Sequence, residues 1–186
     1  MPKKEGLKII KEINLMENQK LILWLNIATI PLALIFIVLF GLIPFFSPTT
    51  TGGFSLWNII LWLVAYVVSI ICHELIHGLF FKIFHLEGKV KFGFKNGMAY
   101  ATSPNSYYTK GQFAVIILAP FIVISTLLII SYYLTILSAI FFVLLAALHA
   151  GSCVGDFYFI YLICRSPKNC LIMDTEVGLS FYHKVS

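Results

Sequence analysis

Charged side chains are scarce in this chain of 186 residues. Lys, Arg, Asp and Glu make up 11% of it, whereas 60% of the residues are hydrophobic, and the mean hydropathy is +0.93. A soluble domain usually carries about a quarter charged residues and is much less apolar. Several runs exceed the roughly 18 apolar residues that indicate a membrane-spanning helix. The composition therefore predicts an integral protein of a lipid bilayer.

Cysteine is also scarce, with four residues and no Cys-x-x-Cys pair, so the sequence provides no disulfide framework. Cys72 and Cys153 are best interpreted as small buried residues. Because both lie near candidate metal ligands in the sequence, ligation of the metal by a cysteine thiolate is an open alternative. The thirteen basic residues outnumber the eight acidic ones. They flank the apolar runs and form no groove, which argues against a nucleic-acid partner.

Four apolar stretches predict four transmembrane helices, and glycines at 151 and 155 indicate a break in the last one. The predicted spans are residues 21–43, 55–84, 112–133 and 134–164. Leu7, Ile10, Ile13 and Met16 recur at three-residue steps within residues 1–20. This spacing predicts an amphipathic helix on the membrane surface, with a solvated tail as the alternative. The mostly polar first 20 residues do not have the pattern of a cleavable signal peptide.

Residues 85–111 form the one substantial polar connection between the spans. From position 89 to 95, lysines and a glycine alternate with Val90, Phe92 and Phe94, and Asn96-Gly97 follows as a turn signal. This pattern predicts a β-hairpin. We therefore expect a single integral membrane domain over residues 1–186. Its fold class is an all-α polytopic protein with a short hairpin between spans two and three and a mixed tail at 165–186.

The basic residues also predict the orientation in the membrane. They lie in or beside the N-terminal segment, the hairpin segment and the C-terminal tail, whereas the connections around Pro48 and Thr135 carry none. Because basic loops stay on the cytoplasmic side, both termini and the hairpin are expected in the cytoplasm. Four spans satisfy this arrangement, and the plasma membrane is the expected location.

The most informative motif is His73-Glu74-x-x-His77, which lies within the second apolar run. On a helix, residues four apart share one face, so the two imidazoles can hold one metal ion, usually zinc. The glutamate is then placed to take a proton from a water molecule that the metal activates. Such groups are costly in hydrocarbon, so their presence in a span indicates function. The motif predicts metal-assisted hydrolysis within a membrane.

A catalytic zinc site requires a third protein ligand, and the later spans offer His149 and Asp156. His73 and His77 precede Lys82 by nine and five residues, which places them roughly 8–14 Å from that boundary. By the same count from Arg165, Asp156 lies roughly 14 Å deep and His149 roughly 24 Å deep. Depth favours Asp156 as the ligand without excluding His149. For His149, a structural hydrogen bond, a role in orienting a ligand or in the transition state, and direct ligation all stay open.

The motif and the later Gly155-Asp156 pair resemble the putative zincin peptidase family of small bacterial membrane proteins and, more distantly, the intramembrane site-2 metalloproteases. The resemblance implies that His73, His77 and Asp156 bind zinc and that Glu74 is the catalytic base. Site-2 proteases tend to carry a strand segment after the metal helix that pairs with an unwound substrate. The predicted hairpin is similar, which makes Phe92, Phe94 and Asn96 candidate substrate-binding residues.

The sequence therefore predicts a zinc-dependent endopeptidase that acts on membrane proteins or peptides near the cytoplasmic side. Glu74 would be its catalytic base, with His149 as a second candidate catalytic residue. A metal-binding transport or structural protein is the alternative, and an enzyme acting on a small molecule or lipid is a third hypothesis. The presence of Glu74 favours the endopeptidase over the transport or structural protein, because a transport or structural site needs no base beside the metal. Another divalent ion that suits nitrogen and oxygen ligands is also compatible with the motif.

Overall fold

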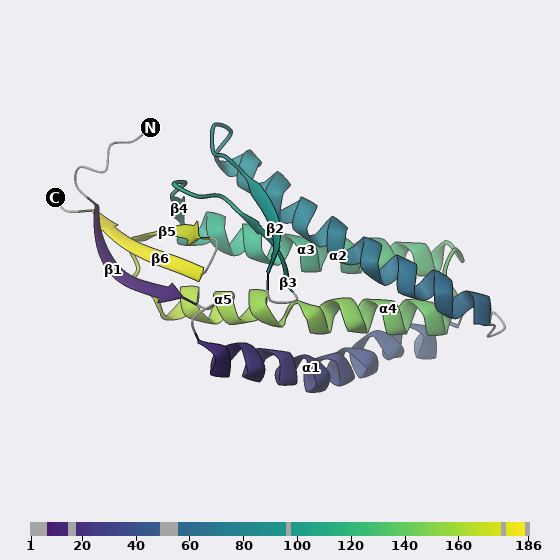
Figure 1. The fold of residues 1–186 in the computed structure, drawn as a ribbon. Coiled ribbons are helices and arrows are strands. Elements are labelled where there is room, and N and C mark those ends of the chain that lie inside the picture. The colour runs from purple at the N-terminus through teal and green to yellow at the C-terminus, as the bar shows by residue number, and fades with distance from the viewer. Residues whose placement is uncertain (1–6, 15–17, 49–55, 96–97, 176–177, 185–186) are drawn as a thin grey trace. The chain divides into compact units, whose positions relative to one another are not determined.

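The computed structural model describes residues 7–14, 18–48, 56–95, 98–175 and 178–184. The helices are α1 (Gln19–Phe46), α2 (Leu56–Phe84), α3 (Lys110–Tyr133), α4 (Ala139–Ser152) and α5 (Val154–Arg165). The strands are β1 (Leu7–Asn14), β2 (Lys91–Lys95), β3 (Met98–Thr102), β4 (Tyr108–Thr109), β5 (Cys170–Thr175) and β6 (Gly178–Lys184) (Figure 1).

The chain divides into two compact units. The helical unit comprises Trp24–His73 and Pro120–Gly155. The sheet unit comprises Met1–Leu23, Glu74–Ala119 and Asp156–Ser186. Helix α2 is continuous from Leu56 to Phe84 and therefore contributes its first part to the helical unit and its second part to the sheet unit.

The predicted spans coincide with helices of membrane length. Among the described residues, α1, α2 and α3 are each long and apolar enough to cross a bilayer, and α4 and α5 qualify together. The predicted second span, 55–84, agrees with α2 to within one residue at its start. The predicted break in the last span is confirmed, because α4 ends and α5 begins on either side of Cys153. By length and composition, the described part of the chain thus has three helices that could span a bilayer, or four when α4 and α5 count as one broken span.

Small residues on α4 hold the helical unit together. Ala146, Ala147 and Ala150 are almost fully buried and pack with three aromatic side chains in one apolar cluster. Tyr132 stacks on Phe142 with ring centroids 5.1 Å apart. The small side chains of these alanines allow neighbouring helices to approach α4 closely beside Phe142, as is common in membrane proteins.

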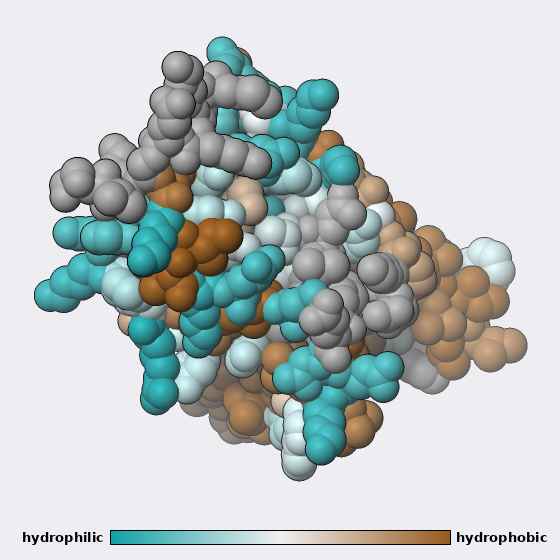
Figure 2. Space-filling model, turned by 60° about the vertical axis from the view of Figure 1, so that its left-hand side comes forward, coloured by the Kyte–Doolittle hydropathy of each residue, from teal (hydrophilic) through white to brown (hydrophobic). Residues whose placement is uncertain are grey.

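The sheet unit contains an antiparallel sheet with the strand order β1-β6-β5-β4. Figure 1 shows β1, β6 and β5 side by side, although β1 precedes every helix and the other two follow the last. One face of β5 carries buried Cys170 and Ile172, which join Phe113 and Leu179 in the core of this unit. Hydrophilic side chains gather over the strands, whereas hydrophobic ones cover the helices (Figure 2).

The expected all-α fold class is only partly right, because residues of both terminal segments form strands. Residues 7–14 are not an amphipathic helix but strand β1, which pairs with β6. Between Ile9 and Lys11 the register shifts, so Ile10 is an extra residue in a β-bulge. In this register Leu7 lies opposite Lys184 and Ile13 lies opposite Leu179, so the residues of the three-residue spacing do not share one face of the strand. The isoleucines of this segment are also favoured in strands.

The hairpin prediction is confirmed by the pairing of β2 with β3. Lys91 lies opposite Thr102 and Lys95 lies opposite Met98. The predicted turn residues Asn96 and Gly97 lie outside the described residues. Strand β4 follows the hairpin and pairs with β5, which connects the 85–111 segment to the C-terminal strands.

Candidate metal centre

Helix α2 presents both histidines of the motif on its buried side. His73 is 7% exposed and His77 is 5% exposed, whereas Leu75, between them in sequence, is 54% exposed. Residues four apart on a helix project in nearly the same direction, and a residue two positions away projects to the opposite side. The two imidazoles therefore lie one turn apart on one face of α2, as the sequence predicts.

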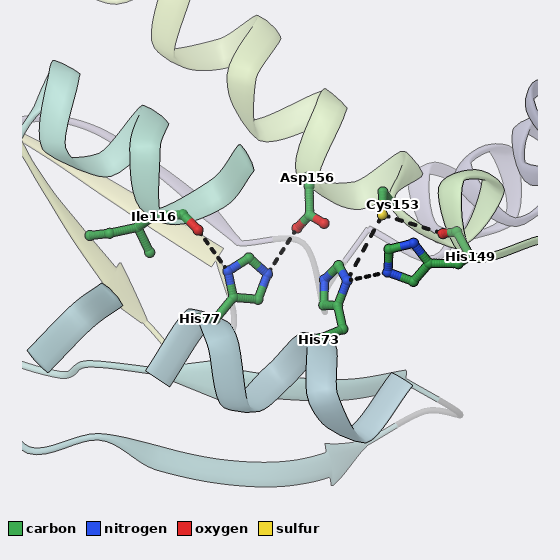
Figure 3. Close-up of polar contacts among 6 residues, drawn as sticks. All are labelled: His73, His77, Ile116, His149, Cys153 and Asp156. Atoms are coloured by element: carbon green, nitrogen blue, oxygen red, sulfur yellow. Dashed lines mark hydrogen bonds and ion pairs between the residues drawn. The ribbon is translucent and has the colours of Figure 1, made fainter. Parts of the chain in front are cut away.

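In the sheet unit, the His77 imidazole has a defined partner at each ring nitrogen. Its Nδ1 lies 3.0 Å from the carbonyl oxygen of Ile116 on α3. Its Nε2 lies 3.4 Å from Oδ1 of Asp156 at the start of α5 (Figure 3). Because a carbonyl only accepts, Nδ1 carries the hydrogen and donates it to Ile116. In the neutral ring, the Nε2 lone pair then faces a carboxylate.

This arrangement suits a cation. Two acceptor atoms that face each other require either a proton on Nε2 or a positive ion between them. A histidine that donates its other N–H to a backbone carbonyl is the usual form of a metal-ligating imidazole. His77 and Asp156 therefore fit a zinc ion in both donor type and orientation.

In the helical unit, His73 contacts His149 and Cys153. Its Nδ1 lies 3.2 Å from Nε2 of His149 and 3.9 Å from Sγ of Cys153. The Cys153 thiol also donates to the carbonyl oxygen of His149 at 3.3 Å (Figure 3). His149 and Cys153 are fully buried. One ligand atom from each of these three residues lies within 4.8 Å of the others, so this group could also hold a metal ion.

The depth predicted from the residue count placed His149 too far from the histidines of α2. A straight last span would place His149 about two turns from the histidines of α2, yet it contacts His73. The chain leaves helical geometry at Cys153 between α4 and α5, so residues on the two sides of the break do not follow one continuous helical rise. His149 contacts His73 and Asp156 contacts His77, and each contact joins α2 to a different part of this broken span.

Glu74 lies half-buried on α2 between the two histidines. It is close enough to act electrostatically on His77, its neighbour on the same helix. Its position one residue after His73 places its carboxyl beside the histidine face of α2.

Asp174 is a buried carboxyl that the sequence analysis missed. It lies on the inward face of β5, is 6% exposed, and is close to Thr102 on β3. Burial raises the pKa of Asp174 from 3.8 to about 7, and the charge of Glu74 contributes in the same direction. The alternation Cys170, Ile172, Asp174 was the available signal, because a strand with period two places all three residues on one face.

Two of the predicted substrate residues, Phe92 and Phe94, lie on strand β2. The Phe92 ring packs against Gly78, where an added Cβ would come within 2.5 Å of ring atom Cζ. Phe94 is 76% exposed. Asn96 lies outside the described residues. Substrate binding by these three residues stays a prediction.

The fold and the site define a class of protein. The chain has several helices of membrane length and buried histidine, cysteine and carboxylate groups that could hold a metal ion. It belongs to the family described as "Putative zincin peptidase", whose model matches residues 66–171. The match includes the histidine motif, the hairpin, Asp156 and α5 but not β1 or β6. Neither the comparison with curated proteins nor that with solved structures gave a match.

Proposed function

We propose that this protein is a membrane-embedded zinc metalloprotease that cleaves membrane-associated or transmembrane proteins near the cytoplasmic side. The observation that carries the proposal is the motif on α2, in which Ile116 orients His77 so that its Nε2 faces Asp156. Membership of a family of zincin peptidases supports a metallopeptidase. The membrane-length helices support a location in the bilayer.

His73, His77 and Asp156 are the proposed zinc ligands. The first two share a face of α2, and the third already contacts the second. His149 has a positioning role in this proposal, because its Nε2 can accept the Nδ1 hydrogen of His73 and so set the tautomer of that imidazole, with its lone pair on Nε2. Ile116 does the same for His77. Each histidine ligand thus has a partner that sets its tautomer.

Glu74 is the proposed catalytic base. Zinc, when bound, would polarise the scissile carbonyl and lower the pKa of water toward about 7. The Glu74 carboxylate takes the proton of the attacking water and then passes it to the nitrogen of the leaving amine. A substrate helix must unwind before cleavage, since helical hydrogen bonds occupy its carbonyls. Backbone pairing with the β2–β3 hairpin is the proposed means of holding the extended segment.

The metal content of the detergent-purified protein tests the ligand set. Wild-type protein, purified without chelator, should contain about one zinc per chain. His73→Ala and Asp156→Ala should lose it, while Glu74→Gln should retain it because Glu74 is not a ligand. A wild type without metal would contradict the proposal.

Protein accumulation in cells tests the catalytic role. In cells that carry only Glu74→Gln, an uncut membrane protein should accumulate, and wild type should restore its cleavage. Loss of zinc from Glu74→Gln would count against the base role. Accumulation of a small molecule or lipid, with no uncut protein, would favour the third hypothesis.

The group formed by His73, His149 and Cys153 favours a second candidate function, a non-proteolytic metal-binding membrane protein. A thiolate with two imidazoles suits zinc or a softer metal ion such as copper(I), and such a set has no need of Glu74. Cys153→Ser separates the two candidates. Unchanged zinc content in this variant supports the protease, whereas loss of the metal with Cys153 and its retention in Asp156→Ala supports the alternative.

A further inference from the structure

A groove of about 650 Å³ opens on the side of α2 that faces away from the histidines. Its helical wall consists of Leu75, Gly78, Leu79 and Lys82. Leu75 and Leu79 follow His73 and His77 by two positions, which corresponds to the opposite face of the helix. They are 54% and 57% exposed. The groove is therefore separate from the proposed metal site.

The second wall of the groove is the segment that enters strand β2. It consists of Lys89, Val90, Lys91 and Phe92. The Phe92 ring lies against the flat surface at Gly78, which holds the strand beside the helix. Within the described part of the chain, this lining includes three lysines and no acidic residue.

The groove joins an apolar surface to a cationic one at the end of a membrane-length helix. Leu75, Leu79 and Ile83 follow one another at four-residue steps on α2, and Ile83 is 56% exposed. An exposed apolar surface on a helix of membrane length faces acyl chains in a bilayer. Lys82, Lys89 and Lys91 are exposed and lie where α2 reaches its polar end. The Lys82 ammonium donates to the carbonyl oxygen of Leu86 and retains two further N–H donors.

We propose that this groove binds one anionic phospholipid, with its phosphate on the three lysines and an acyl chain along Leu75 and Leu79. The charge is complementary to a lipid phosphate, and basic clusters at the end of a span attract anionic lipids. An acidic peptide dissolved in water matches the charge but not the apolar wall, which is continuous with the lipid-facing side of α2. The proposal does not depend on proteolysis or on metal binding.

Lipid titration of the purified full chain tests the proposal. Binding of phosphatidylglycerol and of zwitterionic phosphatidylcholine is measured by native mass spectrometry. Wild type should bind phosphatidylglycerol more tightly. The triple variant Lys82→Gln, Lys89→Gln and Lys91→Gln should bind it about a hundredfold more weakly, from roughly fivefold per lysine.

A matched control removes the same charge elsewhere. It carries Lys8→Gln, Lys11→Gln and Lys20→Gln, all at exposed positions outside the groove, and should bind phosphatidylglycerol like wild type. Because all six lysines are exposed, both variants should keep the wild-type unfolding temperature. Equal weakening in both variants would show a general charge effect and overturn the site. Equal affinity of wild type for the two lipids, or displacement of phosphatidylglycerol by an equimolar acidic peptide, would also overturn it.

Discussion

At the scale of single residues, the two histidines of α2 differ in the kind of hydrogen-bond partner that orients the imidazole ring. His77 donates to a main-chain carbonyl, which no side-chain substitution removes. His73 instead depends on the side chain of His149, at 3.2 Å. The orientation of His73 is therefore the part of the proposed site that a single substitution can disturb without removing a ligand.

His149→Ala should leave the zinc content near one per chain but weaken zinc affinity about 10–100-fold, because His73 loses the partner that orients it. Competition with a chelator of known affinity measures this change. Ser125→Ala, at another buried polar position of the helical unit, should leave the affinity unchanged. Complete loss of zinc in His149→Ala would instead identify His149 as a ligand.

Asp174 should make stability depend on pH. Its pKa is about 7 in the folded protein and has an ordinary value of 3.8, so the folded state binds more protons between these pH values. The stability that Asp174 contributes is then fully present below about pH 4 and is lost as the pH rises toward 7, by about 4 kcal/mol at most. Asp174→Asn should be more stable than wild type at pH 8 and should lose most of this dependence.

Thermal unfolding in detergent at pH 5 and pH 8 measures this effect. The control is Glu12→Gln on β1, which removes an exposed carboxyl and should retain the wild-type difference between the two pH values. An Asp174→Asn variant with the same pH dependence as wild type would contradict the assignment.

At the scale of elements, α4 approaches α1 through Gly151. A Cβ at this position would lie 2.9 Å from Cβ of Ala33 and 3.1 Å from the carbonyl oxygen of Thr29. Both atoms belong to the main chain or lie next to it, so they cannot rotate away. Gly41 on α1 has no atom within 4 Å of the equivalent position.

Gly151→Ala should therefore destabilise the protein by about 1–3 kcal/mol, because the two helices must separate. Gly41→Ala should be neutral or more stable by up to about 1 kcal/mol, because alanine favours a helix. Thermal unfolding of the two variants gives the comparison. Equal stability would show that α1 and α4 tolerate the additional methyl group.

At the scale of the whole molecule, strand pairing constrains the number of membrane crossings. β1 precedes α1, and β6 follows α5, yet Leu7 pairs with Lys184. Paired strands lie on one side of a bilayer, so the chain between them must cross an even number of times. If α1, α2 and α3, each long and apolar enough, cross once, we expect α4 and α5 to cross together as the fourth span. From the positive-inside rule, we expect these strands on the cytoplasmic side.

Thiol labelling of intact cells tests this topology. With a membrane-impermeant reagent, Thr135→Cys in the connection after α3 should add label relative to wild type. Glu87→Cys, between α2 and β2, should add label only after the membrane is permeabilised. The reverse result would place the strands outside the cell, and labelling of both positions from one side would contradict four crossings.

The sequence by itself determined the presence of helices of membrane length, the positions of α1, α2 and α3, and the common face of His73 and His77. These properties depend on hydrophobicity and helical period, which are local. Tertiary structure decided the pairing of β1 with β6, the contact of His149 with His73, 76 positions apart, and the burial of Asp174. Such contacts depend on how distant segments pack and on the break at Cys153, and no local pattern specifies either.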